Sequence, residues 1–373
     1  MSKILQTYDT YYPLGNVVVS LALKADEVFF VYHDTENEKD IRNVQKVLER
    51  KNVKVNLIHL QNDEEEIENI ISNNPDIIID MSAVRYLSLF LFEKALKHNL
   101  RVVYFDDERY CIKDYRTHSM ITDKLYHLSI EDIVNLKGGK IVSSMHDPIK
   151  DEETVKAVSE TVEENLDHYT AFIHAIQKLN SIITNSKKIG SLSYALSDDN
   201  ARYVRNNSQN FYRLLDLENT VLTFKNSHFK KLTEISGSFL EQYLYNKLIS
   251  SNLFDDVKMS AVVDFSGGSY ETVRCEIDCL LVSNNKLLFI SCKSTKASTE
   301  ALNEIYVHNS MFGNVISEPV LVIVEDMSRL SPSIYAKGKE MGVKIIDNTD
   351  FVNDNVTEKI NDIIHNRYEY EED

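Results

Sequence analysis

The fold of the second half of this chain is decided by two neighbouring stretches, RCEIDCLLV at residues 274–282 and KLLFISCK at residues 286–293. Both are rich in the aliphatic and aromatic residues that β-strands favour. Between them stands Asn284-Asn285, a pair that tolerates the positive φ angles of a two-residue hairpin turn. The pattern therefore predicts an antiparallel hairpin within a largely buried sheet.

Charged residues interrupt these apolar strands. A two-residue turn places Glu276 opposite Lys293 and Asp278 opposite Ser291. Because strand side chains alternate between the two faces, all four point to the same side of the sheet. A slip of one residue would change every partner, so the prediction depends on the turn.

Two carboxylates and an ammonium on one patch suit metal-dependent cleavage of a phosphodiester, because carboxylates bind hard cations such as Mg²⁺ and Mn²⁺ and a lysine can orient or activate a water molecule. The candidate catalytic residues on this patch are Lys293, Asp278 and Glu276, and Asp278 is a candidate metal ligand. The nuclease resemblance described below adds Glu241 as a catalytic and metal-binding candidate and the main-chain carbonyl of Cys292 as a candidate metal ligand. A simpler alternative remains open, in which Glu276 and Lys293 form an exposed cross-strand ion pair. Glu241 also has an alternative, since Ser238-Phe239-Leu240-Glu241 fits a helix capping box.

The length and composition of the chain limit how many domains it can form and how it can bind nucleic acid. The 373 residues, 43% hydrophobic and 27% charged, are enough for two or three domains, each with its own core. A net charge of −17 argues against broad, passive binding to nucleic acid, but a nuclease can rely on one cation and local lysines.

The spacing of the cysteines and the lengths of the apolar runs indicate in which cellular compartment the protein is found. None of the four cysteines belongs to a Cys-x-x-Cys pair or to a cluster with zinc spacing. No apolar run is long enough to cross a membrane, and the N-terminus has no signal-peptide pattern. We therefore expect a cytoplasmic protein with reduced thiols and no membrane contact.

Residues 1–145 alternate strand and helix. The predicted strands are Ile4–Tyr8, Glu27–Tyr32, Val53–Leu60, Asp76–Asp80 and Arg101–Phe105, and the predicted helices are Asn16–Leu23, Ile41–Lys51, Glu64–Ser72 and Ala83–His98. This alternation predicts a Rossmann-like parallel sheet with helices on both faces, and the resemblance described below implies that this domain senses a ligand. Residues 106–145 are expected to form short strands and turns.

The rest of the chain divides into two further predicted domains. Residues 146–235 form a connector, helical over 148–188 and winged-helix-like over 190–235, with an apolar stripe from Val155 to Leu166 that could form a dimer surface. Residues 236–373 are predicted to form an α/β domain with a mixed sheet, which the resemblance described below makes restriction-endonuclease-like. The fold class is therefore α/β throughout.

The C-terminal motifs carry a specific resemblance. Asp278, the tight turn and Lys293 match the core of the PD-(D/E)xK nuclease pattern, although Ser291 stands where that pattern has its second acid. The segments ISGSFLEQYLY at 235–245, EID at 276–278 and SCKS at 291–294 resemble the family of CRISPR-associated effector nucleases that carry a CARF sensor domain.

This resemblance implies a homodimer whose two sensor domains bind one cyclic tetra-adenylate. Binding of this activator would switch on a nuclease that cleaves single-stranded DNA, RNA or one strand of duplex DNA with Mn²⁺ or Mg²⁺. By motif position, Asp278 corresponds to a metal ligand, Lys293 to the catalytic lysine and Glu241 to a carboxylate of the site. Ser291 leaves the number of metal ions open.

The N-terminal sheet offers a candidate ligand site, because parallel sheets bind ligands beyond the C-terminal ends of their strands, at the switch point. Two loops that lead into helices supply candidate contacts to a cyclic oligoadenylate: Thr10, Tyr11, Asn16, Ser82 and Arg85. An arginine can pair with phosphate and a tyrosine can stack on adenine. Asn16 and Ser82 also fit ordinary helix caps.

The sequence thus favours a ligand-gated, metal-dependent nuclease of CRISPR antiviral defence. One alternative is a non-enzymatic, ligand-responsive regulator with a decayed nuclease domain, which Ser291 favours. Another is an ungated repair or restriction nuclease.

Overall fold

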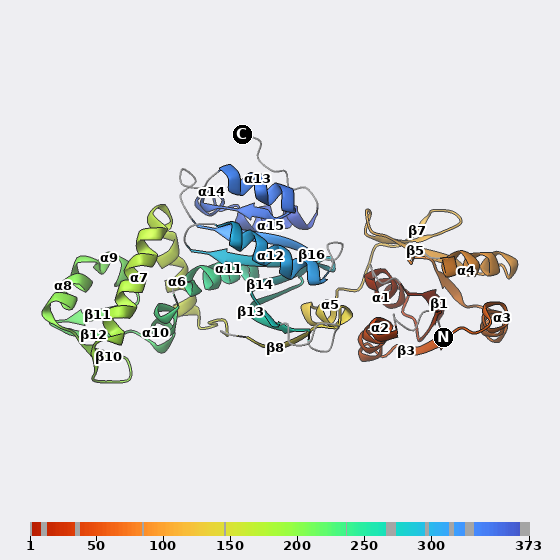
Figure 1. Cartoon of the computed structure of the whole chain (residues 1–373), viewed down its shortest axis with the longest axis horizontal. Helices are drawn as coiled ribbons and strands as arrows, with labels where there is room; N and C mark the ends of the chain where they lie inside the picture. Colours follow the sequence, from red (N-terminus) through yellow and green to blue (C-terminus); the bar gives the residue numbers. More distant parts are fainter. Residues whose placement is uncertain are drawn as a thin grey trace. The chain divides into compact units, whose positions relative to one another are not determined.

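The computed structural model describes residues 2–8, 13–33, 38–83, 86–144, 147–235, 237–265, 274–294, 298–312, 317–324 and 332–365. The chain divides into two compact units, the first made mainly of residues 1–141 and the second mainly of residues 142–373. Figure 1 follows the elements of each unit along the chain. Each unit is described by itself.

The first unit is built on a seven-stranded sheet with the order β3-β2-β1-β4-β5-β6-β7. Its strands are β1 (Lys3–Thr7), β2 (Glu27–Tyr32), β3 (Lys54–His59), β4 (Ile78–Asp80), β5 (Val102–Asp106), β6 (Cys111–Asp114) and β7 (Met120–Thr122). Strands β1 to β5 are parallel, and β6 and β7 add antiparallel pairs. The order reverses between β1 and β4, so the predicted Rossmann-like fold and its switch point are confirmed.

Helices join the parallel strands of this sheet. They are α1 (Pro13–Ala22), α2 (Glu38–Arg50), α3 (Asp63–Asn73), α4 (Tyr86–Lys97) and, after β7, α5 (Ile130–Leu136). Helix α5 lies where only short strands and turns were expected. Ser129 and Asp132 form a capping box at the start of α5, a local sequence motif that favours a helix here.

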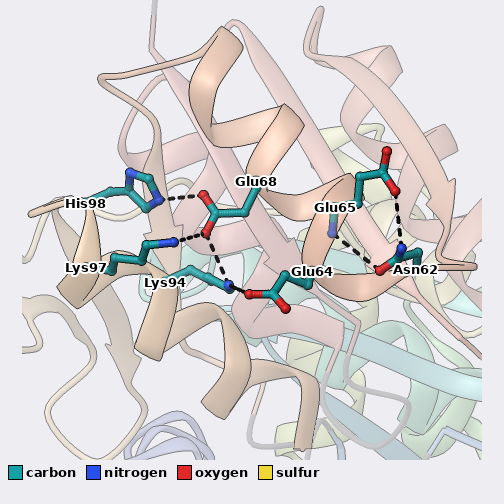
Figure 2. Close-up of polar contacts among 7 residues, drawn as sticks. All are labelled: Asn62, Glu64, Glu65, Glu68, Lys94, Lys97 and His98. Atoms are coloured by element: carbon teal, nitrogen blue, oxygen red, sulfur yellow. Dashed lines mark hydrogen bonds and ion pairs between the residues drawn. The ribbon is translucent and has the colours of Figure 1, made fainter.

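An ion-pair cluster ties α3 to α4. Figure 2 shows Glu68 of α3 facing Lys94 and Lys97 of α4 and His98, the residue that follows α4. Glu68 accepts hydrogen bonds from Lys97 at 2.6 Å, from Lys94 at 3.1 Å and from His98 at 2.6 Å. Lys94, only 3% exposed, also donates to Glu64 at 2.9 Å. Hydrogen bonds from Lys97 and then from Lys94 and His98 outweigh the desolvation of Glu68 and lower its pKa to about 2.

This shift predicts how acid affects the first unit. A carboxylate whose pKa falls on folding stabilises the folded state above its unfolded pKa, and this contribution is lost as the pH falls toward the folded value. We expect Glu68→Gln to lower the thermal unfolding midpoint at pH 7 by a few degrees, and this difference should shrink between pH 4.5 and about 2. Calorimetry at several pH values tests this, with the exposed Glu93→Gln as the control. Equal curves for the two variants would contradict it.

The second unit is built on a six-stranded sheet with the order β17-β16-β15-β14-β13-β8. Its strands are β8 (Lys140–Ser144), β13 (Asp256–Asp264), β14 (Arg274–Ser283), β15 (Lys286–Lys293), β16 (Ser317–Ile323) and β17 (Lys344–Ile346). Strand β15 is antiparallel to β14 and parallel to β16, so the sheet is mixed, as predicted.

The predicted hairpin and its register are confirmed. Asn284 and Asn285 form the two-residue turn, with φ angles of 49° and 57°. The paired residues run from Ser283 opposite Lys286 to Cys279 opposite Ile290. Continuing by one residue places Asp278 opposite Ser291, as the sequence predicts.

A smaller layer precedes this sheet in sequence. It contains the helices α6 (Glu152–Glu163), η2 (Leu166–His168), α7 (Tyr169–Thr184), α8 (Asp198–Asn206), α9 (Ser208–Phe211) and α10 (Ser227–Glu234). It also contains an antiparallel sheet with the order β11-β12-β10-β9, formed by β9 (Lys187–Lys188), β10 (Ser193–Ala195), β11 (Leu215–Glu218) and β12 (Val221–Phe224). These elements occupy the segment predicted to be a winged-helix-like connector, and that assignment remains a prediction.

The segment from α6 to α10 and the six-stranded sheet share one hydrophobic core. That core includes Val158, Val162 and Leu166 together with residues as distant in sequence as Ile364. These stripe residues therefore pack inside the unit, and the homodimer remains a prediction. The division at 145 and 235 remains a prediction, and the compact units meet at 141/142.

Five further helices of the second unit follow in the chain: α11 (Ser238–Ser251), α12 (Thr299–Phe312), α13 (Pro332–Met341), α14 (Asn348–Val352) and α15 (Val356–Ile364). Helices α14 and α15 were not predicted from the sequence. All four cysteines are buried free thiols, as expected. In the part of the chain that the structure describes, no helix is long and apolar enough to cross a membrane.

Candidate active site

Asp278 stands on β14 where that strand meets the end of β15. Its Oδ2 accepts a hydrogen bond from the Cys292 main-chain N–H at 2.6 Å and another from the Ser291 hydroxyl at 3.1 Å. Burial raises the pKa of Asp278, and the Cys292 N–H and the charge of Lys293 oppose that rise. The hairpin register therefore places Asp278 beside Ser291 and fixes one of its carboxylate oxygens.

Glu241 comes from the first turn of α11. Its Oε2 accepts a hydrogen bond from the Ser260 hydroxyl of β13 at 3.2 Å. Burial, and then the nearby charge of Asp278, raise the pKa of Glu241 to about 7. The helix cap is Gly237, with no side-chain hydrogen bond at the cap, so the capping-box interpretation of Glu241 is wrong. Its carboxylate instead lies near enough to feel the charges of Asp278 and Lys293.

Lys293 ends β15 beside a small cavity. Its Nζ lies 3.8 Å from Oε2 of Glu304 on α12, and no ion pair joins it to Glu276 among the described residues. A cavity of about 30 Å³, room for one or two water molecules, is lined by Glu276, Asp278, Ser291, Lys293, Glu304 and His308. Asp278 and Lys293 thus lie on the same side of the sheet.

Two residues of this cavity were not predicted. Glu304 and His308 stand one turn apart on α12, so both side chains lie on one face of the helix. Burial lowers the pKa of His308, while the charges of Glu304 and Asp278 oppose that change. No motif in the sequence marks these two residues, because the docking of α12 on the sheet, a tertiary contact, brings them here.

The oxygen donors fit a hard cation. Both hydrogen bonds to Asp278 fall on Oδ2, so its Oδ1 accepts none from the residues described. Burial raises the pKa values of Asp278 and Glu241, because desolvation disfavours their charged forms. Within the described ranges, no three His, Cys, Asp or Glu side chains are close enough to hold a metal ion by themselves. A cation here would therefore also need main-chain or water oxygens.

In the first unit, two of the candidate ligand contacts lie at the switch point. The Asn16 amide donates to the Thr7 carbonyl at 3.0 Å and to Asp80 Oδ2 at 3.3 Å. The Ser82 hydroxyl donates to Asp80 Oδ1 at 2.6 Å and accepts from the Phe105 N–H at 3.0 Å. Both side chains thus hold the strand ends together.

Burial raises the pKa of Asp80, the centre of these hydrogen bonds, to about 6. The other three candidates, Thr10, Tyr11 and Arg85, lie outside the described residues. Ligand binding by all five residues remains a prediction.

The fold and the site define a two-unit α/β protein with a Rossmann-like first unit and a nuclease-type centre in the second. Residues 230–367 match the family model of the Card1-like endonuclease domain. A comparison with curated proteins finds no match.

Solved structures share the fold over almost the whole chain. Protein VC1899 from Vibrio cholerae is similar with a TM-score of 0.76 and 16% identity, covering 95% of this chain and 96% of that chain. Can2 from Sulfobacillus thermosulfidooxidans, solved in complex with cyclic tetra-adenylate, has a TM-score of 0.68 and 12% identity, covering 95% and 98%. A type III CRISPR defence DNA nuclease activated by cyclic oligoadenylate has a TM-score of 0.53 and 12% identity, covering 86% of this chain and 45% of that one.

These comparisons confirm the resemblance predicted from the motifs. Residues 230–367 match the Card1-like endonuclease domain, which supports nuclease activity, and the chain shares its overall fold with Can2.

The raised pKa of Glu241 predicts an effect of pH on metal-free protein. A carboxyl group whose pKa rises on folding stabilises the folded state below its unfolded pKa, and this contribution is lost as the pH rises through the folded value. In EDTA, Glu241→Gln should change the unfolding midpoint little at pH 5 and raise it at pH 8, above the pKa of about 7. Thermal scans test this, with the exposed Glu358→Gln as control. The same shift at both pH values would contradict it.

Proposed function

We propose that this protein is a metal-dependent endonuclease of type III CRISPR antiviral defence, activated by cyclic tetra-adenylate. The observation that carries the proposal is the cavity shared by Asp278 and Lys293 inside the segment that matches a Card1-like endonuclease domain. The carboxylate of Asp278 and the ammonium of Lys293 line that cavity together, and these two groups can support metal-dependent phosphodiester cleavage.

The residues of the site have distinct proposed roles. Asp278, Glu241 and the Cys292 carbonyl would hold Mn²⁺ or Mg²⁺. When bound, such a cation supplies Lewis-acid chemistry, polarising a phosphate oxygen and lowering the pKa of a coordinated water. Lys293 would orient the attacking water and offset the charge that develops on the phosphate. Glu304 stands beside Lys293 and would limit the directions that its ammonium can take.

The proposed activator rests on the fold of the first unit. Can2, which shares this fold, was solved with cyclic tetra-adenylate, and another similar nuclease is described as activated by cyclic oligoadenylate. A homodimer would present two first units to one cyclic ligand, and the contacts would include Thr10, Tyr11, Asn16, Ser82 and Arg85. The proposed substrates are DNA, RNA or both, and the proposed compartment is the cytoplasm.

Substitution at the cavity tests the catalytic assignment. We expect Lys293→Ala and Asp278→Ala each to slow cleavage by roughly 10²–10⁴-fold, because each removes a group that acts on the reacting atoms. Binding of cyclic tetra-adenylate, measured by calorimetry, should persist in both. Lys258→Ala, on neighbouring β13 and outside the cavity, is the matched control. Undiminished cleavage by either cavity variant would refute the site.

Gating is tested by cleavage of labelled single-stranded DNA, RNA and duplex DNA. We expect cleavage only when both a divalent cation and cyclic tetra-adenylate are present. Cleavage without the cyclic ligand would support the ungated nuclease. Ligand binding with no cleavage of any substrate in Mn²⁺ or Mg²⁺ would support the regulator, which Ser291 favours because the site then lacks the second motif acid.

A further inference from the structure

Ser260 has an unusual backbone conformation for a residue inside a strand. It lies in the middle of β13, fully buried, with φ at +49°. Residues other than glycine avoid this left-handed region, so a serine held there is under backbone strain that the surrounding structure must offset. In strands such a local irregularity re-aims a side chain, and irregularities of this kind gather beside active sites.

The re-aimed side chain meets the site carboxylate. The Ser260 hydroxyl donates to Oε2 of Glu241 at 3.2 Å. The other oxygen of that carboxylate, Oε1, lies against Gly237, where an added Cβ would be 3.2 Å away. The carboxylate is therefore confined from two sides, by the serine hydroxyl and by the start of its own helix.

The neighbouring strand supports this irregularity. Strand β8 lies next to β13 in the sheet, and the Ser144 hydroxyl of β8 donates to the main-chain carbonyl of Met259 at 2.9 Å. Met259 immediately precedes Ser260. A shift of β8 would therefore pull on the peptide that sets the direction of the Ser260 side chain.

Strand β8 is also the segment by which the chain leaves the first unit. It follows α5 directly through Gly138-Gly139, and Gly138 has a φ of +76°. An added Cβ at Gly139 would lie 2.7 Å from the ring of Phe265, the residue just after β13. The segment from Gly139 to Ser144 is therefore in contact at one end with Phe265, just after β13, and at the other end with Met259 of β13.

We propose that Ser260 is a positioning residue for Glu241, and that strand β8 makes this positioning depend on the first unit. The inference rests on the proposed function and adds a route by which ligand binding would reach the cleavage centre. In the active arrangement the hydroxyl holds Glu241 toward Asp278. In the other arrangement β8 shifts, the Met259–Ser260 peptide turns and Glu241 is released.

The first test removes the hydroxyl together with the Cβ that carries it. Ser260→Gly keeps a residue that adopts a φ of +49° without strain, so the fold should survive. We expect Mn²⁺ affinity, measured by calorimetry, to fall roughly tenfold to hundredfold, as loss of a hydrogen bond to a charged group implies. The rate constant kcat should fall with it while KM for the oligonucleotide stays unchanged. Ser193→Ala, which removes another strand serine hydroxyl, one bonded to Thr223 at 3.0 Å, is the matched control.

A double-mutant cycle separates positioning from a general structural role. If Ser260 acts through Glu241, then Ser260→Gly should cost no further Mn²⁺ affinity in a Glu241→Gln background. Additive losses would overturn the assignment, as would wild-type Mn²⁺ affinity in Ser260→Gly. Because the readout is metal affinity, this result stands even if the protein cleaves no substrate, which would refute the proposed function alone.

The β8 link has its own test. Ser144→Ala removes the bond to Met259 and leaves every group of the cavity in place. We expect it to reduce the stimulation of cleavage by cyclic tetra-adenylate roughly fivefold or more, which corresponds to about 1 kcal/mol of coupling. Binding of the cyclic ligand should not change. Stimulation equal to that of the wild type would remove β8 from the route.

Discussion

The proposed active site of the second unit depends on the two-residue turn at Asn284-Asn285, because this turn fixes how strands β14 and β15 pair. Because both residues adopt positive φ, the strands on either side are locked in one register. That register brings Asp278 within 2.6 Å of the Cys292 N–H and leaves Lys293 on the same side of the sheet. One residue more or fewer in the turn would exchange the inward and outward side chains of a whole strand.

Acidic side chains gather around this hairpin, where burial disfavours their charged forms. Asp278 and Glu241 are held near one another with their pKa values raised by burial, and Lys293 lies close to a third carboxylate, Glu304. Such a cluster is tolerated when a cation compensates it. The same reasoning relates the acidic composition to the proposed gating, since a chain of net charge −17 attracts no polyanion without local help.

The hairpin and the parallel sheet were predictable because their signals are local. Alternating apolar runs, an Asn-Asn turn and a βαβ pattern each follow from a few consecutive residues. Helix α14 also carried such a signal, a capping box of Asp347 and Asp350, which was overlooked.

Glu304, His308 and Ser260 could not be found in this way. The first two reach the cavity through the packing of α12 on the sheet, and a left-handed serine within a strand looks like any other serine in the sequence. The capping interpretation of Glu241 failed for the same reason. A local motif fitted the sequence, but contacts with β13 and with the acids of the sheet decided where the carboxylate went.

The position of β8 has a consequence for how the nuclease half can be isolated. The match to the Card1-like domain begins at residue 230, yet β8, at Lys140–Ser144, completes the sheet on the far side of β13. A fragment begun at that match would leave the main-chain N–H and C=O groups of β13 without this neighbour, an open edge that recruits strands from other molecules. The shortest well-behaved nuclease fragment should therefore start before Lys140 and carry the connector with it.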